Sequence, residues 1–95
     1  MAQEHDFASA ESTAVTVGAT TTEVLAAKSG RRYAQLTNDG AEEMYISFGV
    51  DAVMNKGIRL NRRGGSVTIS GTKLYRNSIN AICASGGQNM CILEA

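Results

Sequence analysis

The sequence predicts an all-β protein: a single small β-sandwich or jelly-roll-like barrel of about eight short antiparallel strands, with a flexible N-terminal arm. Apolar and polar residues alternate in short runs, and Gly, Asn, Asp or Ser interrupts these runs. No window of a dozen residues carries the period of a helix. Because 95 residues hold only one core, we expect one domain, formed by residues 13–95. Residues 1–12 have no sustained periodicity, and we expect them to form an extended arm.

The apolar runs follow one another at the spacing typical of sandwiches and barrels. The expected strands are TAVTV (13–17), TTTEVLA (20–26), RYAQLTN (32–38), EMYISFG (43–49), GIRLN (57–61), GSVTISG (65–71), NAICAS (80–85) and NMCILEA (89–95). The last two runs are apolar on both faces. This pattern predicts strands at the centre of a sheet or against a neighbouring subunit.

The strictest alternation lies in residues 31–49, on either side of Asn38, Asp39 and Gly40. These three residue types favour turns, so the segment predicts two antiparallel strands joined by a turn. On this prediction Tyr33 and Tyr45 share the outer face of the hairpin.

The predicted core is aliphatic, because the chain is 43% hydrophobic but only 5% aromatic and has no Trp. Such a core is thin, so association with a partner or with further copies would add stability. The residues expected to be buried are Leu36, Ile46, Phe48, Val67, Ile69 and Ile82.

The two cysteines, Cys83 and Cys91, flank a predicted hairpin around residues 85–88. A three-residue loop would set them opposite each other, and a two-residue loop would offset them by one. We expect two reduced, buried thiols. Zinc is disfavoured because it needs four ligands, and the lone His5 lies far away in the arm.

The charge balance argues against nucleic acid and anionic lipid as partners, because nine basic and nine acidic residues cancel. The apolar runs are far shorter than a bilayer span, and residues 1–12 are polar and acidic where a signal peptide is basic and then apolar. We therefore expect a soluble chain that is made in the cytoplasm.

No motif in the sequence brings a catalytic acid, base or nucleophile together with a partner group. The chain is therefore predicted not to be an enzyme and to need no cofactor. His5 has no nucleophile beside it, and Glu42 and Glu43 would point to opposite faces of a strand. The segment NRRGGSV (61–67) leads into a strand and not into a phosphate-binding helix.

The basic residues at the loop ends have two interpretations. They contact a partner, or they keep the loop ends soluble. The candidate partner-binding residues are Phe7, Arg31, Arg32, Tyr33, Tyr45, Arg59, Arg62 and Arg63.

Four motifs in order resemble those of small β-sandwich virion proteins of tailed bacteriophages. They are T-x-x-E-x-L-A at residues 20–26, a basic-x-Tyr strand that ends in Asn at 32–38, Tyr-x-x-Phe-Gly at 45–49, and a Gly-Gly turn into the next strand at 64–65. The resemblance covers most of residues 15–94. It implies a structural protein of the virion, of the capsid decoration or cement type.

The resemblance further implies a position on the capsid exterior, contact with the major capsid protein and assembly as a homotrimer, after synthesis in the host cytoplasm. Two alternatives stay open. A tail, baseplate or head-fibre module would use the same sandwich on a different protein ring. A carbohydrate-binding module would need a groove lined by aromatic residues or carboxylates, and the chain is poor in aromatics.

Overall fold

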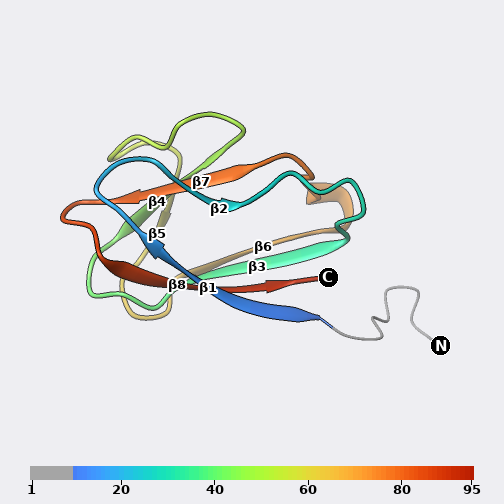
Figure 1. Cartoon of the computed structure of the whole chain (residues 1–95), viewed down its shortest axis with the longest axis horizontal. Helices are drawn as coiled ribbons and strands as arrows, with labels where there is room; N and C mark the ends of the chain where they lie inside the picture. The colour runs from blue at the N-terminus through green and yellow to red at the C-terminus, as the bar shows by residue number, and fades with distance from the viewer. Residues whose placement is uncertain (1–9) are drawn as a thin grey trace.

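The computed structural model describes residues 10–95, which form eight antiparallel strands in two packed sheets (Figure 1). The predicted β-sandwich is therefore confirmed. The elements are β1 (Glu11–Val17), β2 (Thr22–Leu25), β3 (Tyr33–Asn38), β4 (Met44–Phe48), β5 (Ile58–Leu60), β6 (Ser66–Ser70), the short 3-10 helix η1 (Gly71–Lys73), β7 (Ile79–Cys83) and β8 (Gln88–Glu94). Because β1 begins at Glu11, the last two residues of the predicted arm belong to the sandwich.

The strands pair as if the chain were folded in half between β4 and β5. β1 pairs with β8, β2 with β7, β3 with β6, and β4 with β5. The further pairings of β3 with β8 and of β4 with β7 roll this ribbon into sheet A (β1-β8-β3-β6) and sheet B (β2-β7-β4-β5). This arrangement is a jelly roll. The two-sided apolar strands β7 and β8 lie inside their sheets, as predicted.

The predicted hairpin of β3 and β4 is wrong in its pairing, although both strands exist. β3 belongs to sheet A and β4 to sheet B, so residues 39–43 cross between the sheets. Asn38 fixes this crossing, because its buried side-chain amide donates to the Glu42 carbonyl at 2.7 Å and to the Leu60 carbonyl at 3.0 Å. The alternation of apolar and polar residues predicts which face of a strand is buried, but it does not predict which strand pairs with it.

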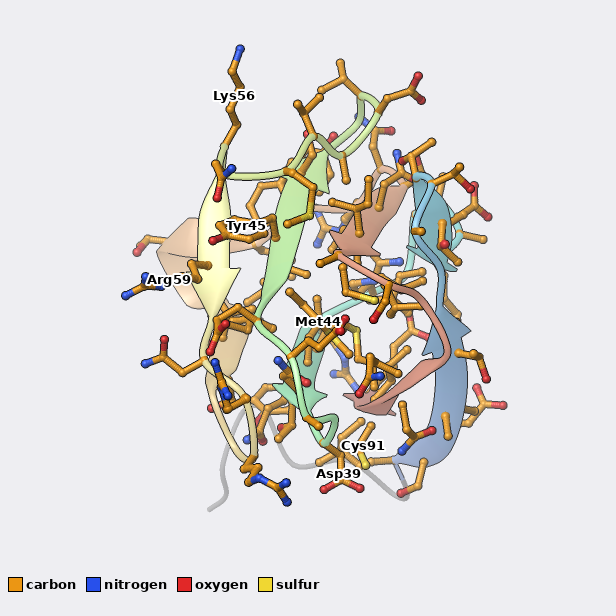
Figure 2. All side chains as sticks on the ribbon, turned by 90° about the vertical axis from the view of Figure 1, so that its left-hand side faces the viewer. Asp39, Met44, Tyr45, Lys56, Arg59 and Cys91 are labelled. Atoms are coloured by element: carbon orange, nitrogen blue, oxygen red, sulfur yellow. The ribbon has the colours of Figure 1, made fainter. Side chains whose placement is uncertain are left out.

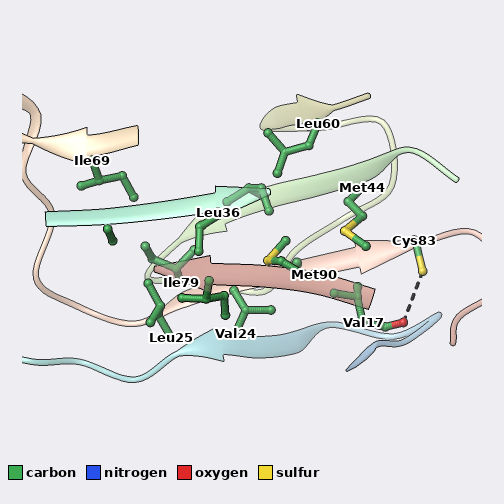
Figure 3. Packing of buried hydrophobic residues seen from close by; sticks show 14 residues of the cluster. Val17, Val24, Leu25, Leu36, Met44, Leu60, Ile69, Ile79, Cys83 and Met90 are labelled. Atoms are coloured by element: carbon green, nitrogen blue, oxygen red, sulfur yellow. Dashed lines mark hydrogen bonds between the residues drawn. The ribbon is translucent and has the colours of Figure 1, made fainter. Parts of the chain in front are cut away.

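The core fills the space between the two sheets with aliphatic and sulfur-containing side chains (Figure 3). Of the predicted core residues, Leu36, Ile46 and Ile69 are buried between the sheets. Phe48 and Val67 are only partly buried and pack against the same cluster. The ring of Phe48 stacks on Tyr75 with centroids 4.8 Å apart.

Ile82 is buried, but it is not on the inner face of its strand. It lies opposite Tyr45 in the register of β7 and β4, whereas its neighbours Ala81 and Cys83 point into the core. Only 8% of Ile82 is exposed. Sheet B therefore has apolar packing on its outer surface as well.

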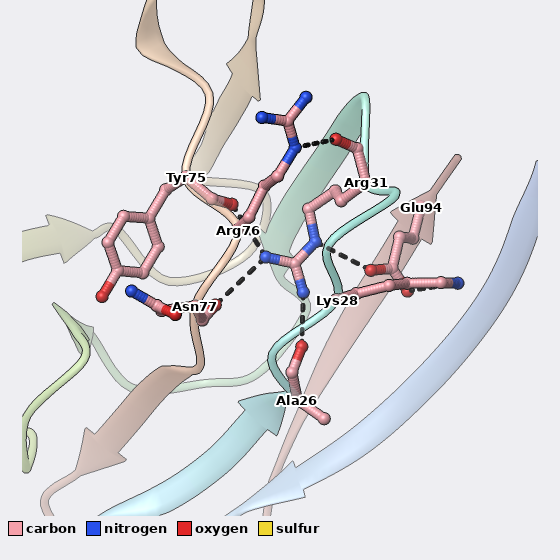
Figure 4. A network of polar contacts seen from close by, with 7 residues as sticks. All are labelled: Ala26, Lys28, Arg31, Tyr75, Arg76, Asn77 and Glu94. Atoms are coloured by element: carbon pink, nitrogen blue, oxygen red, sulfur yellow. Dashed lines mark hydrogen bonds and ion pairs between the residues drawn. The ribbon is translucent and has the colours of Figure 1, made fainter.

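Arg31 is completely buried at the end of the sandwich where β8 ends and β3 begins (Figure 4). Its Nε donates to Glu94 Oε2 at 2.8 Å. The terminal guanidinium nitrogens donate to the carbonyls of Tyr75 at 2.8 Å, Asn77 at 3.1 Å and Ala26 at 2.5 Å. The predicted role of Arg31 in binding a partner is therefore corrected: the side chain ties together four segments of its own chain.

Candidate interaction surfaces

The predicted partner-binding residues do not form one surface. Phe7 lies outside the described residues. Tyr33 and Tyr45 belong to different sheets, so the outer face that they were expected to share does not exist. Arg32 is exposed just before β3. The sandwich thus separates residues that the predicted hairpin would have joined.

The three remaining arginines lie on or after β5. Arg59 is exposed on β5, opposite Tyr45 on β4. Arg62 forms an ion pair with Glu43, with Nε 2.7 Å from Oε2 and Nη2 3.2 Å from Oε1. Arg63 is exposed in the turn after it, at a positive φ of 57°. Arg62 is therefore engaged by a carboxylate of its own chain.

The outer surface of sheet A, which we call the uncharged face, carries no charged side chain on its four strands. Successive residues of a strand point to opposite sides, so the strand pairing fixes which side chains face outward. The outward residues are Ser12, Ala14 and Thr16 of β1; Asn89, Cys91 and Leu93 of β8; Tyr33, Gln35 and Thr37 of β3; and Ser66, Thr68 and Ser70 of β6.

Charges border the uncharged face but do not enter it. Asp39 directly follows β3, and Arg32 directly precedes it. Figure 2 shows Asp39 beside Cys91 at one side of the sandwich, away from Tyr45 and Lys56. A shallow depression of about 380 Å³ lies across β1, β8 and β3, where Gln35, Thr37 and Cys91 contribute to its lining. The face is therefore an uncharged surface with charges at its rim.

The two cysteines are both free thiols, in different surroundings. Cys83 is buried, and its Sγ donates to the Val17 carbonyl oxygen at 3.4 Å. Burial raises the pKa of this thiol. Cys91 is exposed on the uncharged face, so the expectation that both thiols are buried is wrong for Cys91. β7 and β8 lie in different sheets, which removes the predicted hairpin that would have set the cysteines opposite each other.

The outer side of sheet B is different, because it carries charges and a groove. The groove holds about 490 Å³ and lies where β4 begins; we call it the polar groove. Its main lining residues are Glu42, Glu43, Tyr45, Met54, Asn55 and Arg62.

Hydrogen bonds hold both carboxylates of the polar groove in place. The Ser85 amide donates to Glu42 Oε1 at 3.0 Å, and the Ser85 hydroxyl donates to Glu42 Oε2. These bonds lower the pKa of the Glu42 carboxyl. The hydrogen bond from Arg62 lowers the pKa of Glu43. Both carboxylates are therefore fixed, ionised acceptors at neutral pH.

The loop between β4 and β5, together with Ile58 at the start of β5, carries the most exposed large apolar side chains of the described chain. Val50 is 65% exposed, Val53 48% and Ile58 39%. The Asn80 side-chain amide of β7 donates to the Val50 carbonyl at 2.7 Å and so ties this loop to sheet B. We call Val50, Val53 and Ile58 the apolar loop.

Within residues 10–95, no group of three or more His, Cys, Asp or Glu side chains is arranged to hold a metal ion. The same residues include no helix with the length and apolar character needed to cross a membrane. Comparison with known proteins gives no further guide, because no family model, no curated protein and no solved structure matches the chain.

Proposed function

We propose that this protein is a structural component of a tailed-bacteriophage virion, a decoration or cement protein that binds the outer surface of the capsid and stabilises the head. Its partner is the major capsid protein, and it self-associates as a homotrimer on the particle. It acts without catalysis and binds neither nucleic acid nor membrane. The uncharged face is the observation that carries the proposal.

An uncharged face of this size is unusual for a surface that stays in water. Roughly a quarter to a third of the residues on a soluble surface are charged. The buried centre of a protein interface is depleted of charge, because a charge that loses its water without gaining a partner is costly. Sheet B carries Glu23 and Arg59 on its outer side, so the lack of charge belongs to sheet A alone. We therefore place the capsid protein against sheet A.

The occupant of the uncharged face is inferred from its charge and its size. A flat, uncharged capsid surface leaves no ionic group unpaired against Thr, Ser and Gln side chains. From strand spacing and rise, four strands of this length cover roughly 400 Å², about half of what each partner contributes to a standard interface. A lone contact of this size is weak, but capsids present many identical sites, and trimer contacts and the arm add to the buried area.

The jelly roll itself does not decide the function, because the same architecture serves in viral capsid proteins and in lectins. The location and copy number of the chain distinguish the capsid from the tail. We expect it in the head fraction of purified virions, in a copy number that scales with the capsid lattice. A low copy number in the tail fraction would assign it to a tail or baseplate ring, and absence from virions would overturn the proposal.

The two thiols provide a direct test of which face is seated on the capsid. In the free folded protein we expect a maleimide to modify Cys91 rapidly and Cys83 only after unfolding, because Cys83 is buried and its pKa is raised. On particles, Cys91 should become protected. Intact-mass measurement after brief labelling reports both sites, and a Cys91→Ser variant identifies any residual signal from Cys83. Equal labelling of Cys91 in free and particle-bound protein would contradict seating through sheet A.

Deleting residues 1–10 should leave the sandwich folded and reduce its occupancy on particles. The deletion stops before β1, so it removes no strand residue. Phe7 and the acidic Glu4 and Asp6 would add apolar and ionic contacts at the edge of a face that is small by itself. Cooperative thermal unfolding and particle pull-down measure the two effects.

A Gly-Ser segment of the same length is the matched control for this deletion. Because it restores the length and not the chemistry of residues 1–10, it should bind as poorly as the deletion. Unchanged occupancy after deletion would remove the arm from the binding surface.

A further inference from the structure

From the lining of the polar groove we infer a second binding site on the outer side of sheet B, whose ligand is a neutral saccharide. The groove combines one aromatic ring, two fixed carboxylates, a guanidinium and a side-chain amide. This site goes beyond the proposed capsid contact, which uses sheet A.

The size of the groove suits a small ligand. Its volume of about 490 Å³ exceeds the 380 Å³ of the depression on sheet A and the 230 Å³ of the hollow beside the apolar loop. Ligand pockets in proteins hold about 300–1,000 Å³. One or two sugar rings fit within this range.

The charges of the groove select against other ligand classes. The carboxylates of Glu42 and Glu43 outnumber the Arg62 guanidinium, which is already paired with Glu43, so the lining is negative and repels anions. An apolar ligand would cover these ionic groups without pairing them, which is costly. A neutral polyhydroxyl ligand donates hydroxyl hydrogens to the carboxylates and accepts hydrogen bonds from Asn55 and Arg62.

The groups that would contact the sugar are held in position before it binds. The Glu43–Arg62 pair is bidentate, and the Glu42 carboxylate is anchored by Ser85. Each carboxylate oxygen has a second lone pair for a ligand hydroxyl. Tyr45 is half-buried between Arg59 of β5 and Ile82 of β7, so its ring has a fixed place beside the groove. An aromatic ring of this kind offers a face to the C–H groups of a sugar.

The groove shares no lining residue with the depression on sheet A, because it is formed by Tyr45 of β4 and by loops next to the strands of sheet B. A copy seated on a particle through the uncharged face would present the polar groove to the surroundings.

The test uses the free full-length protein on an array of neutral and acidic glycans, followed by titration with the strongest neutral glycan. We expect binding to neutral glycans, and a loss of affinity of about tenfold or more in Tyr45→Ala. Asn55→Gly should weaken binding as well, and it is tolerated by the fold because Asn55 already has a φ of 67°. This second variant keeps the test valid if Tyr45→Ala unfolds.

The matched control is Tyr33→Ala, which removes the same ring from sheet A and should bind like the unmodified protein. The inference is overturned if no neutral glycan is retained, if acidic glycans bind more tightly, or if Asn55→Gly and folded Tyr45→Ala bind with unchanged affinity. None of these outcomes bears on capsid binding, since no particle is present in the experiment.

Discussion

Replacing Arg31 with alanine is expected to lower the free energy of unfolding by about 3–5 kcal/mol, because it removes one partner of a buried ion pair. The Glu94 carboxylate, with a side chain only 12% exposed, would lose its 2.8 Å hydrogen bond from Arg31. The carbonyls of Ala26, Tyr75 and Asn77 would lose their donors at the same time. A loss of this size is a large part of the total stability of so small a domain.

Thermal and denaturant unfolding measure the effect, which should lower the melting temperature by roughly 15–30 °C. Arg32→Ala is the matched control, because Arg32 is the exposed neighbour and its replacement should cost under about 1 kcal/mol. Arg31→Lys should restore little, since an ammonium group cannot reach the same set of acceptors. Equal stabilities of Arg31→Ala and Arg32→Ala would show that the network does not close this end of the sandwich.

The strands could be predicted from the sequence because burial of one face is a local property. The alternation in residues 32–38 and 43–49 marks β3 and β4 whatever strands they pair with. Their partners could not be predicted in the same way. The connection of residues 39–43 is short enough for a hairpin and long enough to cross to the other sheet, and tertiary packing chose the crossing.

The candidate interaction surfaces are less predictable from the sequence, because they depend on which strands become neighbours. Four of the strand segments have only uncharged residues at alternate positions. These residues form one continuous surface only because β1, β8, β3 and β6 belong to the same sheet. Arg31 and Arg32 are identical residues side by side in the sequence. Arg31 is structural because carbonyls from separate segments of the fold converge on its guanidinium, whereas Arg32 is exposed. The sequence does not show which of the two arginines meets these carbonyls.

Replacing Cys91 with arginine is expected to reduce occupancy on particles about 100-fold or more while leaving the free sandwich stable. Cys91 is exposed on an internal strand of the uncharged face, so the new side chain has room in the free protein. Against the capsid the guanidinium would lose its water and its bulk would hold the two surfaces apart, and a penalty of about 3 kcal/mol already corresponds to a change of more than 100-fold in affinity.

Binding of purified variants to stripped particles measures this effect, with thermal unfolding as the check on folding. Cys91→Ser keeps the face uncharged and should bind like the unmodified protein, while Ser47→Arg adds the same charge to sheet B and should also bind. The comparison of the two arginine variants shows whether particle binding depends on the position of the added charge or on the added charge alone. If Cys91→Arg binds as well as Cys91→Ser, sheet A is not the seat, and the apolar loop becomes the next surface to substitute, because Val50 and Val53 are its most exposed side chains.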